Sequence, residues 1–193
     1  MKLLFVILIL AGFVWSLNSC DPAKTGAATS TNAAPSKDSL IKRGNYLVTT
    51  IGCNDCHSPK KMGPQGPFVD PDRMLSGSPA GAPAPVASAE DIKNHQIVFS
   101  GDLTACVGPW GTSFSANITS DATGIGNWTL EQFKYALRNG KYMGLKEGRM
   151  LMPPMPWDEL GKLNDADMEA IFTYLKSTKP VKNVVPSYRP PGK

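Results

Sequence analysis

The residues with the clearest chemistry in this chain lie in one short stretch, Cys53-Asn54-Asp55-Cys56-His57. Two cysteines three positions apart, followed at once by a histidine, form the C-x-x-C-H pattern of covalent haem attachment. The spacing has a chemical reason, because both thiols can reach the vinyl groups on one porphyrin edge while the imidazole comes to lie beneath the iron. The pattern predicts one covalently bound haem c, with thioether bonds to Cys53 and Cys56 and with His57 as the proximal iron ligand.

Three other roles are open to the two cysteines. A thioredoxin-like pair normally lies between a strand and a helix, whereas a helical pattern precedes Cys53 and no alternating strands follow. A structural disulfide suits an oxidising compartment, but it leaves His57 without a role. A zinc site is the third alternative, although its ligands lack the spacing of compact zinc modules. Those ligands would be Cys53, Cys56, His95 and Cys106.

A second iron ligand is expected on the face opposite His57. In electron-carrying haem proteins it is commonly a methionine, which raises the reduction potential. Met155 is the predicted distal ligand because it lies in Met152-Pro153-Pro154-Met155-Pro156-Trp157, where prolines fix φ, exclude helix and stiffen the loop. Met152 is the second candidate. His95 would give bis-histidine ligation, but a lone histidine is more often a hydrogen-bonded structural residue.

This ligand set predicts an electron carrier and not an enzyme. If protein fills both axial positions, no iron site remains open for a substrate, so outer-sphere electron transfer is the expected function. One alternative is a haem enzyme or gas-binding sensor whose sixth position stays open. Another is a structural lipoprotein with zinc or a disulfide at Cys53 and Cys56.

The charge of the chain bears on its partners. The formal net charge of +4 is spread along the sequence without a basic block, which argues against nucleic-acid binding. Redox proteins of a respiratory chain are the expected partners. Six basic residues could steer an acidic partner to the haem edge, although scattered solvated lysines are common on any soluble protein. They are Lys60, Lys61, Lys134, Arg138, Lys141 and Lys146.

The N-terminus predicts export. Lys2 precedes an apolar run over residues 3–17. This run is shorter than the roughly 20 residues of a membrane-spanning helix and is typical of a secretory signal. It ends at Leu17-Asn18-Ser19-Cys20, which resembles a bacterial lipoprotein cleavage site, so Cys20 is the predicted lipidated residue. An uncleaved anchor helix, or a plain signal peptide with an accidental Cys20, are the alternatives.

These features divide the chain into three parts. Residues 1–19 are the predicted signal peptide, and residues 20–38 are the lipidated cysteine with a flexible linker, because the polar segment after Cys20 has no apolar periodicity. Residues 39–193 form the predicted folded domain. The expected location is the periplasmic side of a bacterial membrane, held there by the lipid anchor.

Three helices are expected to position the site. Apolar periodicity predicts a helix over residues 39–51, immediately before the cysteines. A capping box at Thr129 and Gln132 begins a second helix that ends at Asn139-Gly140. A third begins at Asn164 and ends before Pro180. Loops are expected between residues 60 and 95, with a short strand over 96–100, so the fold class is mostly α with long loops.

The motifs resemble those of class I-type cytochrome c domains, and in particular the haem domains in cytochrome subunits of bacterial membrane-bound alcohol and sugar-acid dehydrogenases. The resemblance covers most of residues 41–186. It rests on Arg43-Gly-Asn-Tyr-Leu, Gly108-Pro-Trp-Gly, Asn117-Ile-Thr-Ser-Asp, Thr123-Gly-Ile-Gly-Asn-Trp128, Met152-Pro-Pro-Met-Pro-Trp157 and Tyr174-Leu-Lys-Ser.

The resemblance implies a cytochrome c fold around one covalently attached haem. It implies thioether bonds at Cys53 and Cys56 and axial ligation by His57 and Met155. It also implies that the first and last helices cross, with Gly44 and Tyr174 in the contact. Asn117 and Trp128 are expected near the haem or its propionates, although Trp128 could equally fill the core. The dehydrogenase subunits have several C-x-x-C-H motifs, whereas this chain has one, and Cys106 is expected to be a buried free thiol or to form an intermolecular disulfide.

Overall fold

The computed structural model describes residues 34–192, so the predicted signal peptide, Cys20 and most of the linker lie outside the described part. A compact unit begins at Pro35. Its helices are α1 (Lys37–Thr50), α2 (Cys53–His57), α3 (Ala89–Lys93), α4 (Leu130–Asn139), α5 (Trp157–Leu160) and α6 (Asp165–Ser177), with a 3-10 turn η1 (Tyr142–Gly144). Its strands are β1 (Lys60–Gly63), β2 (Gly66–Val69), β3 (Val98–Phe99), β4 (Ala105–Gly108) and β5 (Gly111–Phe114).

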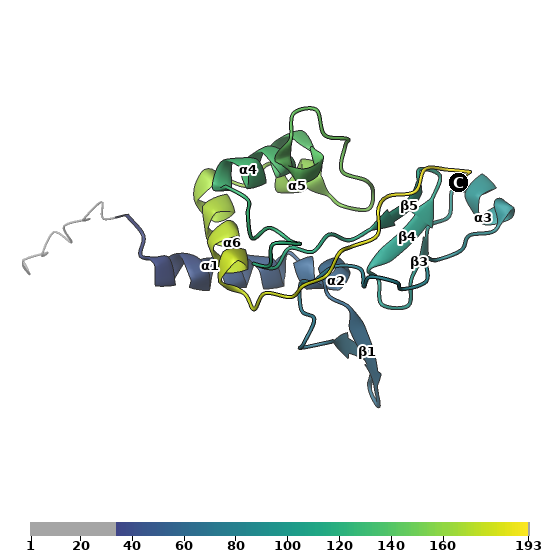
Figure 1. Ribbon diagram of the computed structural model, residues 1–193, viewed down its shortest axis with the longest axis horizontal. Helices are drawn as coiled ribbons and strands as arrows, with labels where there is room; N and C mark the ends of the chain where they lie inside the picture. Colours follow the sequence, from purple (N-terminus) through teal and green to yellow (C-terminus); the bar gives the residue numbers. More distant parts are fainter. Residues whose placement is uncertain (1–33, 193) are drawn as a thin grey trace, which may run out of the picture. The chain divides into compact units, whose positions relative to one another are not determined.

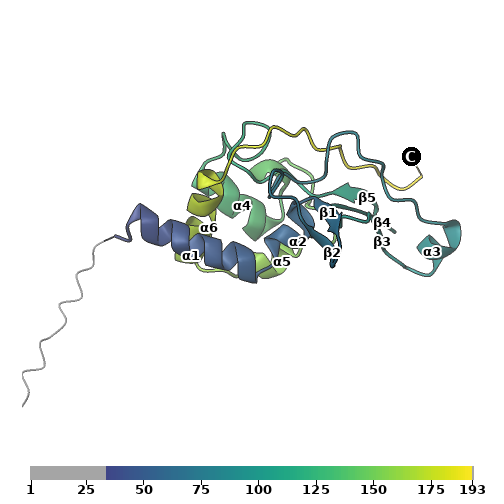
Figure 2. The same cartoon turned by 90° about the horizontal axis from the view of Figure 1, so that it is seen from below.

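These elements form two groups within the unit. Figure 1 shows α1, α4, α5 and α6 together on one side and the β3–β4–β5 sheet on the other. Seen from below, α2 lies between the two groups (Figure 2). The C-x-x-C-H stretch, which forms α2, therefore lies where the helical group meets the strands. Within residues 34–192, no helix is both long enough and apolar enough to cross a membrane.

The three predicted helices are confirmed. Helix α1 begins two residues before the predicted boundary because the Ser36 hydroxyl accepts a hydrogen bond from the Ser39 amide and caps the helix. Helix α4 has the predicted capping box between Thr129 and Gln132. It ends at Asn139, and the next residue, Gly140, adopts the left-handed conformation. Asn164 caps α6 through the amide of Asp167. Local capping chemistry thus fixes where each helix begins.

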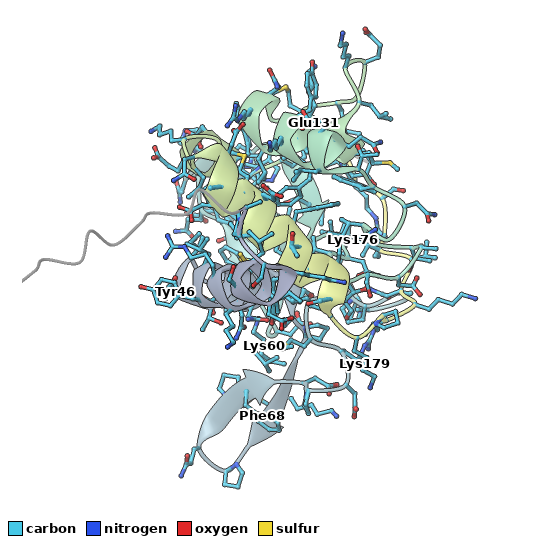
Figure 3. The ribbon with its side chains drawn as sticks, turned by 90° about the vertical axis from the view of Figure 1, so that its left-hand side faces the viewer. Tyr46, Lys60, Phe68, Glu131, Lys176 and Lys179 are labelled. Atoms are coloured by element: carbon cyan, nitrogen blue, oxygen red, sulfur yellow. The ribbon has the colours of Figure 1, made fainter. Side chains whose placement is uncertain are left out.

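Helices α1 and α6 cross at close range. Figure 3 shows α6 running across α1, as the family resemblance implies. A β-carbon added to Gly44 would overlap the Ala170 carbonyl oxygen and lie 2.6 Å from the β-carbon of Tyr174. The absence of a side chain at Gly44 therefore sets the distance between the two helices.

The hydrophobic core lies beneath this crossing. Val48 of α1 and Met168 and Leu175 of α6 are almost fully buried, and Phe133 and Leu137 of α4 complete the cluster. Burying a side chain of this size contributes roughly 1.5–3 kcal/mol relative to exposure. The apolar faces of the three predicted helices thus meet in one core.

The prediction of loops between residues 60 and 95 was wrong in two places. Strands β1 and β2 form an antiparallel hairpin in which Gly63 pairs with Gly66, and residues 89–93 form α3. The hairpin projects away from the helices, with Phe68 on it (Figure 3). Its four-residue strands contain Gly and Pro and lack alternating apolar residues, so they gave no period-two signal.

The second sheet is also larger than expected. The predicted strand over residues 96–100 is confirmed as β3, but β3 pairs with β4, and β4 pairs with β5 through a tight turn at Pro109-Trp110. The segment after α6 runs back to this sheet, as the yellow trace in Figure 1 shows. There, the backbones of Thr112 and Arg189 exchange hydrogen bonds of 2.8 and 3.0 Å. The C-terminal segment thereby links the helical group to the strands.

Candidate functional site

Helix α2 presents the C-x-x-C-H residues in about one turn. Cys53 and Cys56 are half-buried free thiols. Residues three apart lie on the same face of a helix, so the two sulfur atoms face one side, as attachment to one porphyrin edge requires. Burial raises the pKa of Cys53 to about 11 and raises the pKa of Cys56 above its ordinary value. These surroundings favour neutral sulfur, as in a thiol or a thioether, over a thiolate.

His57 is buried and held by one backbone contact. Its Nδ1 lies 2.8 Å from the carbonyl oxygen of Ala116. A carbonyl oxygen only accepts hydrogen bonds, so Nδ1 carries the proton and Nε2 keeps its lone pair. Burial lowers the pKa of His57 below its ordinary value, and the hydrogen bond to Ala116 opposes that effect in part. The ring is thus a neutral, oriented imidazole, the form in which histidine binds a metal.

Met155 lies at the edge of the hydrophobic core, and its place opposite His57 stays a prediction. Its half-buried side chain packs against the same core cluster as Cys53. Its backbone N–H lies 3.3 Å from the Met152 oxygen, and its carbonyl accepts from the Trp157 amide at 2.9 Å, immediately before α5. Met168 is fully buried in the core. Within residues 34–192, the remaining methionines outside this loop are exposed, namely Met62, Met74, Met143 and Met150.

These donors fit a haem better than a zinc ion. Two free thiols on one helical face, an oriented imidazole and an apolar thioether match the residues that a covalent haem needs. The alternative zinc site would need Cys53, Cys56, His95 and Cys106 to converge on one point. His95 is exposed. No group of three or more His, Cys, Asp or Glu side chains within residues 34–192 is arranged to hold a metal ion.

Asn117 has a structural role in addition to any contact with a cofactor. Its amide nitrogen donates to Val181 O at 2.8 Å and to Thr123 Oγ1 at 3.1 Å. Its amide oxygen accepts from the backbone N–H and the hydroxyl of Thr119 at 3.0 and 2.8 Å. These four bonds use the ordinary hydrogen-bonding capacity of the amide, so Asn117 ties the C-terminal segment to the loop after β5. Proximity of Asn117 to the haem stays a prediction.

Trp128 is half-buried and packs against the core cluster, which agrees with the core-filling alternative.

Cys106 is buried, with 1% of its surface exposed, and it is a free thiol as predicted. Sequence reasoning missed Ala116, because a backbone carbonyl carries no residue-type signal.

Comparison with known proteins agrees with this arrangement. The family model for cytochrome c matches residues 41–179, which contain the C-x-x-C-H stretch, Met155 and the crossing helices. This chain belongs to the cytochrome c family. Membership implies haem c as the cofactor and electron transfer as the general function.

Several relatives are larger cytochrome c proteins. The chain is 32% identical to an alcohol dehydrogenase (quinone) cytochrome c subunit of Gluconobacter oxydans over 78% of this chain and 24% of the relative. It is 33% identical to a fructose dehydrogenase cytochrome subunit of Gluconobacter japonicus over 73% and 22%. It is 31% identical to a gluconate 2-dehydrogenase cytochrome c subunit of Pantoea cypripedii over 71% and 23%. The chain therefore spans about a quarter of the length of these relatives.

Proposed function

We propose that this chain is an extracytoplasmic electron carrier with a single haem c, attached at Cys53 and Cys56 and ligated by His57 and Met155. The observation that carries the proposal is the orientation of His57 by Ala116, which leaves Nε2 free. In addition, the half-buried Met155 packs against the same core cluster as Cys53. When bound, haem accepts and donates one electron. The residues around it hold it rigidly, supply both axial ligands and exclude water.

The location rests on the sequence. The predicted signal peptide and Cys20 support a location at the periplasmic side of a bacterial membrane, with a lipid anchor. An oxidoreductase that passes electrons to the haem is the proposed partner, because the relatives are cytochrome subunits of dehydrogenases. The chain itself would be an electron-transfer accessory and not the catalytic subunit.

The basic residues give this partner only a weak electrostatic guide. Lys61 pairs with Asp70 at 2.9 Å, and both Lys134 and Arg138 pair with Asp165. Lys60 donates to backbone carbonyls of α2, including Asn54 O at 3.2 Å. Partner recognition is therefore expected to depend modestly on ionic strength, because acidic neighbours offset several of the charges.

Two measurements on the full chain test the function. The protein should be produced in a bacterium with a haem-attachment system and run on a haem-stained denaturing gel. A stained band is expected, because thioether bonds survive denaturation, and an unstained band would favour the structural lipoprotein.

Optical spectra are the second measurement. The oxidised protein should show a methionine-to-iron charge-transfer band. The reduced spectrum should not change with carbon monoxide, whereas a change would favour a haem enzyme or gas sensor.

A further inference from the structure

One short segment contacts the predicted ligand regions on both sides of the site. Within residues 113–116, the Ala116 carbonyl accepts the hydrogen bond from His57 Nδ1 at 2.8 Å. Three residues earlier, the Ser113 hydroxyl donates to the carbonyl oxygen of Pro153 at 2.7 Å. Pro153 lies two residues before Met155. The end of β5 and the residues after it therefore contact both the histidine and the methionine loop.

The Pro153 carbonyl determines the direction of the Ser113 hydroxyl, because a carbonyl oxygen can only accept a hydrogen bond. A serine hydroxyl has one hydrogen to donate and two lone pairs that accept. Because its hydrogen is directed to Pro153, the Cys106 thiol at 3.2 Å and the Trp110 indole N–H at 3.4 Å are the donors to the Ser113 oxygen. The Ser113 hydroxyl thus donates one hydrogen bond and accepts two, which uses its full hydrogen-bonding capacity.

The contacts of Ser113 also give a structural role to Cys106 and to the Gly108-Pro-Trp-Gly motif. Cys106 lies on β4 opposite Ser113 on β5 in the strand register. A β-carbon added to Gly108 would lie 2.7 Å from the Trp110 ring, so only glycine allows the indole to fold back over the strand. The Tyr188 hydroxyl donates to the Trp110 carbonyl at 2.5 Å and holds the turn from the other side.

The contact at Pro153 is well placed to control Met155. Prolines 153 and 154 have fixed φ angles, so anchoring the Pro153 carbonyl restricts the path of the next two residues. Within residues 34–192, Ser113 is the side chain that donates a hydrogen bond to the loop over 152–156, because the single hydrogen of the Cys106 thiol is directed to Ser113 and its sulfur lies 3.8 Å from the Pro153 oxygen. A thioether is a weak iron ligand, so its occupancy is sensitive to a loop that moves.

We infer that Ser113, oriented by Cys106 and Trp110, is a positioning residue that holds the Met155 loop in the ligating conformation. This inference rests on the proposed His57 and Met155 ligation. Loss of the hydroxyl frees the Pro153 carbonyl, increases the population of loop conformations in which Met155 is off the iron, and lets external ligands compete more effectively.

Imidazole binding to the oxidised full-length holoprotein tests this, followed by absorbance. Ser113→Ala should bind imidazole roughly 2- to 10-fold more tightly than the wild type, the range of one hydrogen bond. Ser113→Thr, which keeps a hydroxyl, should bind imidazole as weakly as the wild type does. Ser115→Ala is the matched control, because within residues 34–192 Ser115 hydrogen-bonds only through its backbone.

The outcomes separate this inference from the proposed function. If Met155→Ala abolishes the charge-transfer band but Ser113→Ala binds imidazole as the wild type does, the positioning role is overturned and the ligation stands. If the wild type lacks the band, both are overturned. Cys106→Ala gives a second test should Ser113→Ala not accumulate as holoprotein, because it removes the thiol that orients Ser113. Tighter imidazole binding is again expected, and wild-type binding would contradict the inference.

Discussion

The backbone of Gly44 on α1 approaches Tyr174 on α6 so closely that an added β-carbon would lie 2.6 Å from the Tyr174 β-carbon. The same atom would overlap the carbonyl oxygen of Ala170. Backbone atoms cannot turn aside as a flexible side chain can, so any larger residue at position 44 must separate the two helices. Because α1 leads directly into α2, the position of the C-x-x-C-H residues depends on this contact.

Gly44→Ala is therefore expected to lower the free energy of unfolding by about 1–3 kcal/mol, the usual cost of overpacking. Urea denaturation followed by circular dichroism measures this. Gly101→Ala is the control, since a β-carbon there meets no atom within 4 Å, and its effect should be within roughly 0.5 kcal/mol. Equal stabilities of the two variants would show that the helix crossing adapts to a methyl group.

Met155→Ala is expected to lower the reduction potential, because a methionine ligand raises it. The variant should also lose the charge-transfer band and bind carbon monoxide when reduced. Potentiometric titration and optical spectra measure these changes. Met62→Ala is the control, because Met62 is 78% exposed on the hairpin. A Met155→Ala spectrum identical to the wild type would move the ligand to Met152 or another residue.

The ion pair between Arg43 and Asp167 predicts a pH dependence of stability. Arg43 Nε lies 2.8 Å from Asp167 Oδ1, and this hydrogen bond holds the pKa of Asp167 below its ordinary value. A carboxylate with a depressed pKa in the folded state stabilises the protein above its unfolded pKa and loses that effect as the pH falls through its folded pKa.

Arg43→Gln should therefore be less stable than the wild type near pH 7, and the difference should shrink below about pH 4, near the reference pKa of aspartate. Thermal unfolding at several pH values measures it. Lys162→Gln, which removes an exposed pair with Glu159, should change stability less, since both partners are exposed to solvent. A constant difference across the pH range would exclude Asp167 as the group responsible.

Asn183 anchors the C-terminal segment with a buried amide. Its nitrogen donates to Ser76 O at 2.7 Å and to Ser78 O at 2.9 Å, and its oxygen accepts from the Ala80 amide at 2.9 Å. Asn183→Ala should cost roughly 1–3 kcal/mol, because it leaves buried backbone groups without partners. Urea denaturation measures this, with the exposed Asn139→Ala as the control. An equally small effect for both variants would mean that water replaces the lost bonds.

The number of reactive thiols tests both covalent attachments at once. The full chain has four cysteines. If haem occupies Cys53 and Cys56 and lipid occupies Cys20, the unfolded protein should expose a single reactive thiol after disulfide reduction, that of Cys106. In the folded protein Cys106 should react slowly, because it is buried and burial raises its pKa. Two thiols would exclude the lipid, and three or four would exclude the haem.

Much of the helical framework was determined by the sequence alone. Ser36 was missed as a cap, but the boundaries of α4 and α6 followed from Thr129, Gln132 and Asn164, since a cap bonds to an amide two or three residues away. The C-x-x-C-H stretch is equally local, because the helix that it forms places its side chains together. Export and lipidation also depend on a local pattern, and they stay predictions.

Only the tertiary structure decided how the predicted ligands are held. His57 is oriented by a carbonyl 59 residues away, and the Met155 loop is bonded by Ser113 from 40 residues away. The first acceptor is a backbone oxygen, which every residue possesses, and Ser113 is a common residue in a strand that gave no periodic signal. Contacts of this kind depend on how the chain is folded back on itself, and no spacing in the sequence encodes them.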